Sequence, residues 1–215
     1  METVVLPISS RSALARALEI LTSGGLVAFP TDTVYGLGAL AYDAAAVGEI
    51  YVVKGRGLEK AIPILISDYS QLERVASGTN HIVRRLSDKF WPGALTMVVP
   101  RHPMIPDAVT PLQTVGVRIP NLETTRELLR LTGPLAVTSA NISGQSSPST
   151  AQGVLMQLNG KIPLILDGGV TPGGVPSTVV DCTDLEPKVL REGPISAAQI
   201  YAALKPTGTL SLDGT

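Results

Sequence analysis

Residues 28–66 read AFPTDTVYGLGALAYDAAAVGEIYVVKGRGLEKAIPILI, and this stretch sets hydroxyl groups, glycines and cations beside short apolar runs. The apolar run 26–29 predicts a buried strand. The strand should end abruptly, because Pro30 has no N–H to offer a neighbouring strand. Loops at strand ends often carry binding and catalytic groups. We therefore expect a functional site in the loop that begins at Pro30.

The side chains of that loop suit a polar ligand. Thr31 and Thr33 offer neutral donors and acceptors, and Asp32 offers an acceptor. Gly36 and Gly38 have no Cβ, so their backbone N–H groups can approach a ligand closely. The loop could therefore contact a ligand through both side chains and backbone.

Three cations follow in the segment KGRGLEK, namely Lys54, Arg56 and Lys60. The guanidinium of an arginine binds phosphate as a planar fork, and the ammonium group of a lysine binds it as a point charge. The segment therefore suits phosphate oxygens. Gly55 and Gly57 favour a non-helical path there. An ordinary exposed loop of surface charges explains the segment equally well when it is taken alone.

The segment GLGALA at 36–41 formally matches the dinucleotide-binding pattern GxGxxA, but its position is wrong. In that fingerprint the first glycine follows the strand directly and opens a helix. Here residues 30–35 intervene, and Asp43 is the better N-cap, for a helix over 44–53. The phosphate-loop pattern GxxxxGK[ST] is absent from the sequence as well. A nucleotide would have to be bound by neither common motif.

The composition indicates a compact globular protein. The chain has 215 residues, of which 44% are hydrophobic and only 16% charged, so a sizeable core can form. The net charge of −1 argues against a surface built mainly for polyanions and leaves only a local basic groove for nucleic acid. We expect one domain over 1–204 and a disordered tail over 205–215, where glycine, threonine and serine dominate.

Cysteine usage and the N-terminus favour a soluble cytoplasmic protein with no membrane partner. Cys182 is the single cysteine, which excludes an internal disulfide and fits a reducing compartment. Its apolar neighbours predict a buried, unreactive thiol. The N-terminus lacks a signal-peptide pattern, and no apolar run is long enough to span a membrane.

Apolar, β-rich runs alternate with helical patterns along the chain, which is typical of an α/β (α+β) fold. Helices are expected from residue 9 or 10 to the glycines at 24–25 and over 43–53, 69–76, 80–88, 122–131, 150–158 and 196–204. Strands are expected over 3–6, 26–29, 62–66, 95–99, 115–119, 135–138, 164–166, 177–181 and 188–191. The last two strands are too close in sequence for a helical crossover, so part of the sheet must be antiparallel.

Three later clusters place small hydroxyl groups, amides and single cations at the ends of apolar runs. They are TVGVRIP at 114–120, TSANISG at 138–144, and PSTVVD at 176–181 with REG at 191–193. In the first, strict alternation puts Arg118 on the face opposite Val115 and Val117. That face meets either a ligand carboxylate or open water. A turn stabilised by Ser, Thr and Asn side chains is enough to explain the second cluster.

Together these clusters resemble the YrdC family of threonylcarbamoyl-AMP synthases, and the resemblance spans nearly the whole chain. The matching stretches are PTDTVYGLGALA at 30–41, KGRGLEK at 54–60, WPGALT at 91–96, VGVRIP at 115–120, SANISGQSSPS at 139–149, PSTVVD at 176–181 and REG at 191–193. The resemblance implies a twisted mixed parallel and antiparallel sheet, flanked by helices around a concave basic cavity.

The resemblance also implies a nucleotidyltransferase reaction. L-threonine, bicarbonate or CO₂, and ATP would give threonylcarbamoyl-AMP and pyrophosphate for the tRNA modification threonylcarbamoyladenosine. ATP would be a substrate accompanied by Mg²⁺, held largely by phosphate oxygens and water. Proteins that transfer the threonylcarbamoyl group to tRNA would be the downstream partners.

Site roles follow from the same resemblance. The implied L-threonine contacts are Thr33, Arg118, Ser139 and Ser177. The implied ATP contacts are Lys54, Arg56, Lys60, Thr114, Asn141, Ser149 and Arg191. Lys54 and Arg56 are expected to be catalytic through their charges. No nucleophile, histidine base or protein metal ligand is expected, because the reaction needs proximity and electrostatic stabilisation more than covalent help.

The chain departs from the family pattern at two positions and in length. Gly57 stands where proline is frequent, and Leu65 stands where many longer members have a histidine. Longer members also carry a second C-terminal domain, so we expect a stand-alone synthase domain. One alternative is a module that binds double-stranded RNA or tRNA without synthase activity. Another is carbamoyl transfer, as in hydrogenase-maturation proteins, which is disfavoured because no CxxC zinc-finger pattern occurs here.

Overall fold

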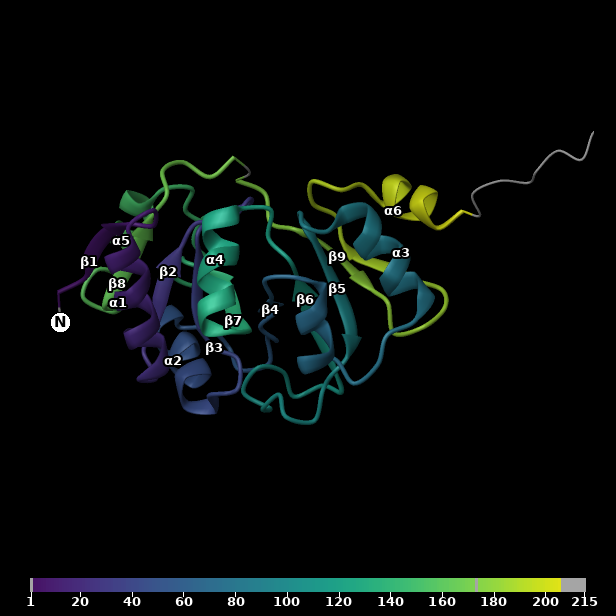
Figure 1. Ribbon diagram of the computed structural model, residues 1–215, viewed down its shortest axis with the longest axis horizontal. Helices are drawn as coiled ribbons and strands as arrows, with labels where there is room; N and C mark the ends of the chain where they lie inside the picture. Colours follow the sequence, from purple (N-terminus) through teal and green to yellow (C-terminus); the bar gives the residue numbers. More distant parts are fainter. Residues whose placement is uncertain (1, 173, 206–215) are drawn as a thin grey trace, which may run out of the picture.

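Helices surround one large mixed sheet (Figure 1). The computed structural model describes residues 2–172 and 174–205. The helices are α1 (Arg11–Thr22), α2 (Ala44–Lys54), the 3₁₀ helix η1 (Tyr69–Arg74), α3 (His81–Phe90), α4 (Glu123–Thr132), α5 (Ala151–Leu158) and α6 (Ala197–Leu204). The strands are β1 (Val4–Pro7), β2 (Val27–Phe29), β3 (Gly36–Leu40), β4 (Ile64–Leu65), β5 (Leu95–Pro100), β6 (Thr114–Arg118), β7 (Leu135–Ser139), β8 (Leu164–Asp167), β9 (Thr178–Asp181) and β10 (Lys188–Arg191).

The sheet is mixed, as the sequence predicts. Its ten strands follow the order β1-β8-β2-β3-β7-β4-β6-β5-β9-β10. Strand β4 pairs parallel with β6 and antiparallel with β7, while β5 pairs antiparallel with β6 and parallel with β9. The expected antiparallel pairing of the last two strands is confirmed, with Lys188 opposite Asp181. Strands from distant parts of the sequence therefore meet in the middle of the sheet.

The strand β3 is a correction to the sequence analysis, which interpreted the glycines at 36 and 38 only as ligand contacts. It forms a hairpin with β2, in which Val27 lies opposite Gly38 and Phe29 opposite Gly36. A Cβ on Gly36 would lie 2.6 Å from Cγ1 of Val137, and one on Gly38 would lie 2.8 Å from Cε1 of Phe29. The glycines are therefore needed because large side chains lie across this strand.

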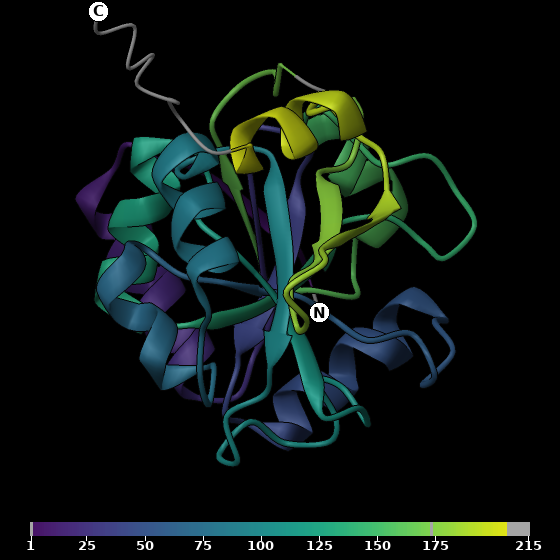
Figure 2. The same cartoon turned by 90° about the vertical axis from the view of Figure 1, so that its right-hand side faces the viewer.

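Two apolar cores lie on opposite faces of the sheet. On one face α1 and α4 contact each other and cover residues such as Phe29 and Val137 (Figure 1). On the other face α2, α3, α5 and α6 contribute to the larger core. Figure 2 shows α6, in yellow, beside α3, in agreement with the contacts between these two helices. The buried face of α1 is formed by Ala13, Leu14, Ala17, Ile20 and Leu21.

The helix that follows β3, α2, begins after the predicted N-cap residue Asp43. The carboxylate of Asp43 accepts the N–H groups of Ala45 and Ala46, each at 3.0 Å, and so caps α2. Helix α2 thus begins four residues after Leu40 and not at the glycines, which confirms that the dinucleotide fingerprint is absent. It ends at Lys54, where Gly55 adopts the left-handed conformation with φ of 58°. The expected helix over 69–76 is a 3₁₀ helix over Tyr69–Arg74.

Three further expectations concern the ends and the thiol. Cys182 is buried, as expected, and burial raises the pKa of its thiol to about 12, which disfavours the reactive thiolate. No helix within residues 2–172 and 174–205 is long and apolar enough to cross a membrane. Most of the expected tail, residues 206–215, lies outside the described residues, and the domain boundary at 204 stays a prediction.

Candidate active site

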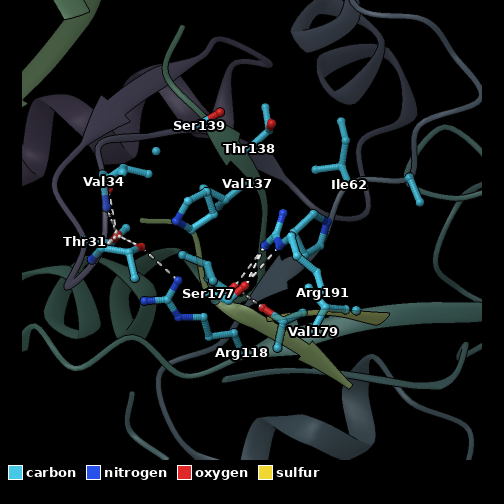
Figure 3. A pocket seen from close by; sticks show the side chains of 18 of the residues that line it. Thr31, Val34, Ile62, Arg118, Val137, Thr138, Ser139, Ser177, Val179 and Arg191 are labelled. Carbon is cyan, nitrogen blue, oxygen red and sulfur yellow. Dashed lines mark hydrogen bonds between the residues drawn. The ribbon is translucent and has the colours of Figure 1, made fainter. Parts of the chain in front are cut away.

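A cavity of about 340 Å³ lies over the central strands of the sheet (Figure 3). Alternate residues of each strand face it, among them Gly116 and Arg118 of β6 and Thr96 and Val98 of β5, because side chains alternate between the faces of a strand. Its lining includes six of the predicted site residues, namely Thr33, Arg56, Arg118, Ser139, Ser177 and Arg191. Three of these are arginines, and no Asp or Glu is found among the lining residues in the described part of the chain. The cavity is therefore a concave basic site, as expected.

Arg118 faces the cavity and not open water, since it is 6% exposed. Its Nε donates to the carbonyl oxygen of Gly93 at 2.9 Å, and its Nη1 donates to Oγ1 of Thr33 at 3.0 Å. Its Nη2 forms a salt bridge with the carboxylate of Asp32. Burial lowers the pKa of Arg118, and the charge of Asp32 opposes that shift. Each Nη carries two protons, so one on each nitrogen remains for a ligand.

The loop between β2 and β3 positions Thr33 for this contact. Oγ1 of Thr31 donates to the carbonyl oxygen of Val34 at 2.7 Å and accepts the backbone N–H of Thr33 at 3.1 Å. The two threonine hydroxyl groups lie 2.9 Å apart. This is a turn stabilised by a threonine side chain, so the first hydroxyl group shapes the loop and the second faces Arg118. Thr31 also lines the cavity, as expected for a polar group of this loop, although it was not among the implied L-threonine contacts.

Ser177 and Arg191 meet at the centre of the cavity (Figure 3). Arg191 donates to the carbonyl oxygen of Ser177 through Nε at 3.2 Å and through Nη2 at 2.7 Å. The hydroxyl group of Ser177 lies 2.8 Å from Oγ1 of Thr96 on the neighbouring strand. The sequence analysis gave Thr96 no role, although this residue ends the family-like stretch WPGALT at 91–96 and is a hydroxyl residue within the apolar run of β5.

Lys54 is 2% exposed and lies behind the cavity wall. Its ammonium group donates to the backbone carbonyl oxygens of Ser139 and Asn141 at the end of β7. Burial, followed by the nearby charge of Arg56, lowers the pKa of Lys54 to about 8. In this conformation Lys54 holds the segment after β7 in place through these two backbone carbonyl oxygens.

Arg56 reaches the cavity from the segment that follows α2. Its Nε donates to the carbonyl oxygen of Lys60 at 3.3 Å and its Nη2 to that of Ala61 at 3.1 Å. Partial burial lowers the pKa of Arg56. Lys60 itself is exposed and does not line the cavity. The segment thus curls around the guanidinium of Arg56 and presents it at the rim.

Like Lys54 and Lys60, three further predicted ATP contacts lie away from the cavity lining. Thr114 is half-buried at the start of β6, opposite Pro100. Asn141 is 6% exposed; its Nδ2 donates to two backbone carbonyl oxygens, while its Oδ1 is buried with no hydrogen-bond partner in the described part of the chain. The carbonyl oxygen of Ser149 accepts the backbone N–H of Thr171 at 2.8 Å. The structure brings the threonine-side residues together more closely than the ATP-side residues.

The sheet, the cavity and its three arginines define an α/β protein with a basic cavity whose chemistry suits small anionic ligands. The sequence model of the Sua5/YciO/YrdC family, described as telomere recombination, matches residues 19–193. The chain belongs to this family.

Individual relatives agree with that assignment. The threonylcarbamoyl-AMP synthase of Bacillus subtilis is 43% identical over 199 residues, which cover 90% of this chain and 57% of that protein. The crystal structure of Pyrococcus abyssi Sua5 complexed with L-threonine is 40% identical, with a TM-score of 0.91, and the match covers 94% of this chain and 61% of that one. The threonylcarbamoyl-AMP synthase of Vibrio cholerae is 32% identical over 184 residues, or 84% of this chain and 97% of that protein.

The chain thus spans 57% of the Bacillus protein and 61% of the Pyrococcus chain, a little over half the length of these two relatives.

Proposed function

We propose that this chain is a threonylcarbamoyl-AMP synthase, a nucleotidyltransferase that converts L-threonine, bicarbonate and ATP into threonylcarbamoyl-AMP and pyrophosphate for tRNA threonylcarbamoyladenosine formation. The observation that carries the proposal is the buried guanidinium of Arg118. It is held by Thr33 and Asp32 and keeps donors free in a basic cavity. A related structure with the same fold is complexed with L-threonine. A guanidinium fork is the usual partner of a carboxylate.

The amino acid would bind across the floor of the cavity. Its carboxylate would contact Arg118 and Thr33, and its polar groups would contact Ser139 and Ser177, all four of which line the cavity. Apolar residues such as Val34, Leu65 and Val137 would surround its methyl group. Since one methyl group is worth only about 1–3 kcal/mol of discrimination, serine should be a poor but detectable substrate.

ATP would enter from the side of Arg56. The exposed Lys60 and the guanidinium of Arg191 would add positive charge along the triphosphate. The contacts of ATP with Thr114, Asn141 and Ser149 stay predictions. Lys54 contributes by fixing Ser139 and Asn141, and by its own positive charge behind them. With two reactants held close and anions neutralised, little covalent chemistry is asked of the protein.

Magnesium fits this site as a companion of the triphosphate. No group of three His, Cys, Asp or Glu residues that could hold a metal ion occurs in residues 2–172 and 174–205. We therefore propose that phosphate oxygens and water are its main ligands, as is common for Mg²⁺. A cytoplasmic location and proteins that receive the adenylate stay predictions.

The test is pyrophosphate release from ATP, bicarbonate and Mg²⁺, with and without L-threonine, combined with mass detection of the adenylate. Threonine-dependent release with the matching product supports the proposal. Folded protein that binds ATP and releases no pyrophosphate would contradict it.

Binding of tRNA or double-stranded RNA is a second candidate function, favoured by the arginine-lined cavity. It should weaken steeply as salt rises, because phosphate contacts release counterions. Synthase activity should depend mainly on its substrates, so a salt series separates the two functions.

A further inference from the structure

The arginines of the cavity differ in how their charges are balanced. Arg118 forms a salt bridge with Asp32, whereas Arg191 has no carboxylate partner within the described ranges. The contacts of Arg191 use Nε and Nη2, both on the carbonyl oxygen of Ser177, and leave its Nη1 without a protein partner there. Burial is the main reason that the pKa of Arg118 is lowered, and the positive charge of Arg191 lowers it slightly further. The region around Arg191 therefore carries an uncompensated positive charge.

Two buried hydroxyl groups lie next to this charge. Oγ1 of Thr96 and Oγ of Ser177 are 2.8 Å apart, and these residues are 4% and 6% exposed. Nη2 of Arg191 lies 3.5 Å from Oγ of Ser177. Two hydroxyl groups that share one hydrogen bond retain one proton that can be donated to a ligand. Together with Nη1 of Arg191, this gives convergent donors for a small oxyanion.

The position of these donors indicates which anion they would hold. Figure 3 shows Ser177 and Arg191 between Arg118 on one side and Ile62 on the other. Arg56 donates to the carbonyl oxygen of Ala61, the residue before Ile62, so it lies on the second side. An amino acid with its carboxylate on Arg118 and a triphosphate near Arg56 would therefore meet at Ser177 and Arg191.

We propose that Thr96, Ser177 and Arg191 form a subsite for bicarbonate and for the carbamate made from it. This inference rests on the proposed synthase function and adds a place for the third substrate. Thr96 had no assigned role, and Ser177 and Arg191 were assigned to threonine and ATP. The subsite is compatible with these two assignments, because the carbamate lies between the two substrates. It is bonded to the threonine nitrogen at one end and bonds to the α-phosphorus of ATP at the other.

The chemistry keeps one negative charge at this point. The neutral amine of threonine attacks the carbon of bicarbonate, an N–C bond forms, and the C–OH bond breaks. The hydroxide leaves with the amine proton as water, and the product is a carbamate monoanion. Its oxygen then attacks the α-phosphorus of ATP, and pyrophosphate leaves. A guanidinium that stabilises bicarbonate therefore stabilises the carbamate equally well.

The experiment is a bicarbonate titration of pyrophosphate release for the Thr96→Val variant. Removing this hydroxyl group should raise the half-saturating bicarbonate concentration about tenfold, because a hydrogen bond to a charged group is lost. Half-saturation by threonine and by ATP should stay within about twofold. Thr96→Ser keeps the hydroxyl group and should recover most of the bicarbonate affinity that Thr96→Val loses. Thr110→Val removes another buried hydroxyl group, outside the cavity lining, and is the matched control.

The outcomes separate the two proposals. If the unaltered protein releases no pyrophosphate in response to threonine, the proposed synthase function is wrong. Active unaltered protein with an unchanged bicarbonate requirement in Thr96→Val rejects the subsite alone, as does an equal rise for all three substrates.

A second measurement needs no variant and decides the case if Thr96→Val fails to fold. Nitrate, a planar monoanion, should inhibit the unaltered protein competitively with bicarbonate and not with threonine. Inhibition that competes only with ATP would overturn the proposal. Faster initial rates with dissolved CO₂ than with bicarbonate, measured before the two interconvert, would also overturn it, because neutral CO₂ needs no guanidinium.

Discussion

Arg118 and Asp32 form a salt bridge in which only 7% of the arginine side chain and 12% of the aspartate side chain remain exposed. Such a pair loses most of its hydration, so its charges depend on one another and on well-placed hydrogen bonds. The arginine meets this need with Gly93 and Thr33. Asp32 thus keeps a guanidinium buried at the place where a substrate carboxylate would bind.

Asp32→Asn should destabilise the protein by about 3 kcal/mol, because it leaves the buried charge of Arg118 without its partner. It should also raise the half-saturating threonine concentration more than that of ATP, since the guanidinium loses one of its supports. Denaturant unfolding and substrate titrations measure the two effects. Asp107→Asn is a suitable control, because its salt-bridging side chain is 83% exposed and should contribute little.

The two substrates should respond differently to the loss of different arginines. Arg118→Ala should raise the threonine requirement at least about tenfold with a smaller effect on ATP, since a charge-assisted hydrogen bond is lost. Arg56→Ala should do the reverse. Steady-state titration of each substrate checks both variants. Equal effects on threonine and ATP in both variants would contradict the assignment of the two sides of the cavity.

The two glycines Gly38 and Gly48 should respond oppositely to alanine. A Cβ at Gly38 would meet the buried ring of Phe29 at 2.8 Å, so Gly38→Ala should cost about 1–3 kcal/mol of unfolding free energy. Gly48 lies within helix α2 with nothing inside 4 Å of an added Cβ, so Gly48→Ala should stabilise the protein by about 0.5–1 kcal/mol. Denaturant unfolding compares them directly, and a neutral Gly38→Ala would contradict the close packing of β3.

Lys54 should make stability depend on pH above neutrality. Its pKa falls from 10.5 to about 8 on folding, so between these values the unfolded chain binds the extra proton and the folded protein does not. The free energy of unfolding should therefore rise as the pH increases from about 8 to 10.5. Lys54→Met carries no proton and should lack this rise. The measurement is the difference in unfolding free energy between the two proteins across that range, and parallel curves would argue against the lowered pKa.

Most of the regular structure could be predicted from apolar periodicity and capping residues, as α2 and its N-cap Asp43 illustrate. The strand β3 could not, because its sequence GLGAL has neither β-branched residues nor polar alternation. Its strand character comes from pairing with β2 and β7, which lies outside local propensity. The expected polar glycine loop is in fact part of the buried sheet.

The candidate site was predictable at the ends of apolar runs, where Thr33, Arg118, Ser139 and Ser177 were expected and do line one cavity. The burial of Lys54 was not predictable, because a cation beside glycines suggests an exposed loop. Thr96 gave only a weak signal, since one hydroxyl group in an apolar strand usually packs in the core. Whether a residue such as Lys54 or Thr96 is buried or lines the cavity depends on contacts with strands that are distant in the sequence.

The cavity brings three guanidinium groups together without an acidic side chain of its own among the described lining residues. That charge would attract pyrophosphate as strongly as it attracts the tail of ATP. We therefore expect product departure, and not bond formation, to limit turnover. Accumulated pyrophosphate should drive the reaction backwards to ATP, so in the cell the direction of flow would be set by whatever removes pyrophosphate and the adenylate.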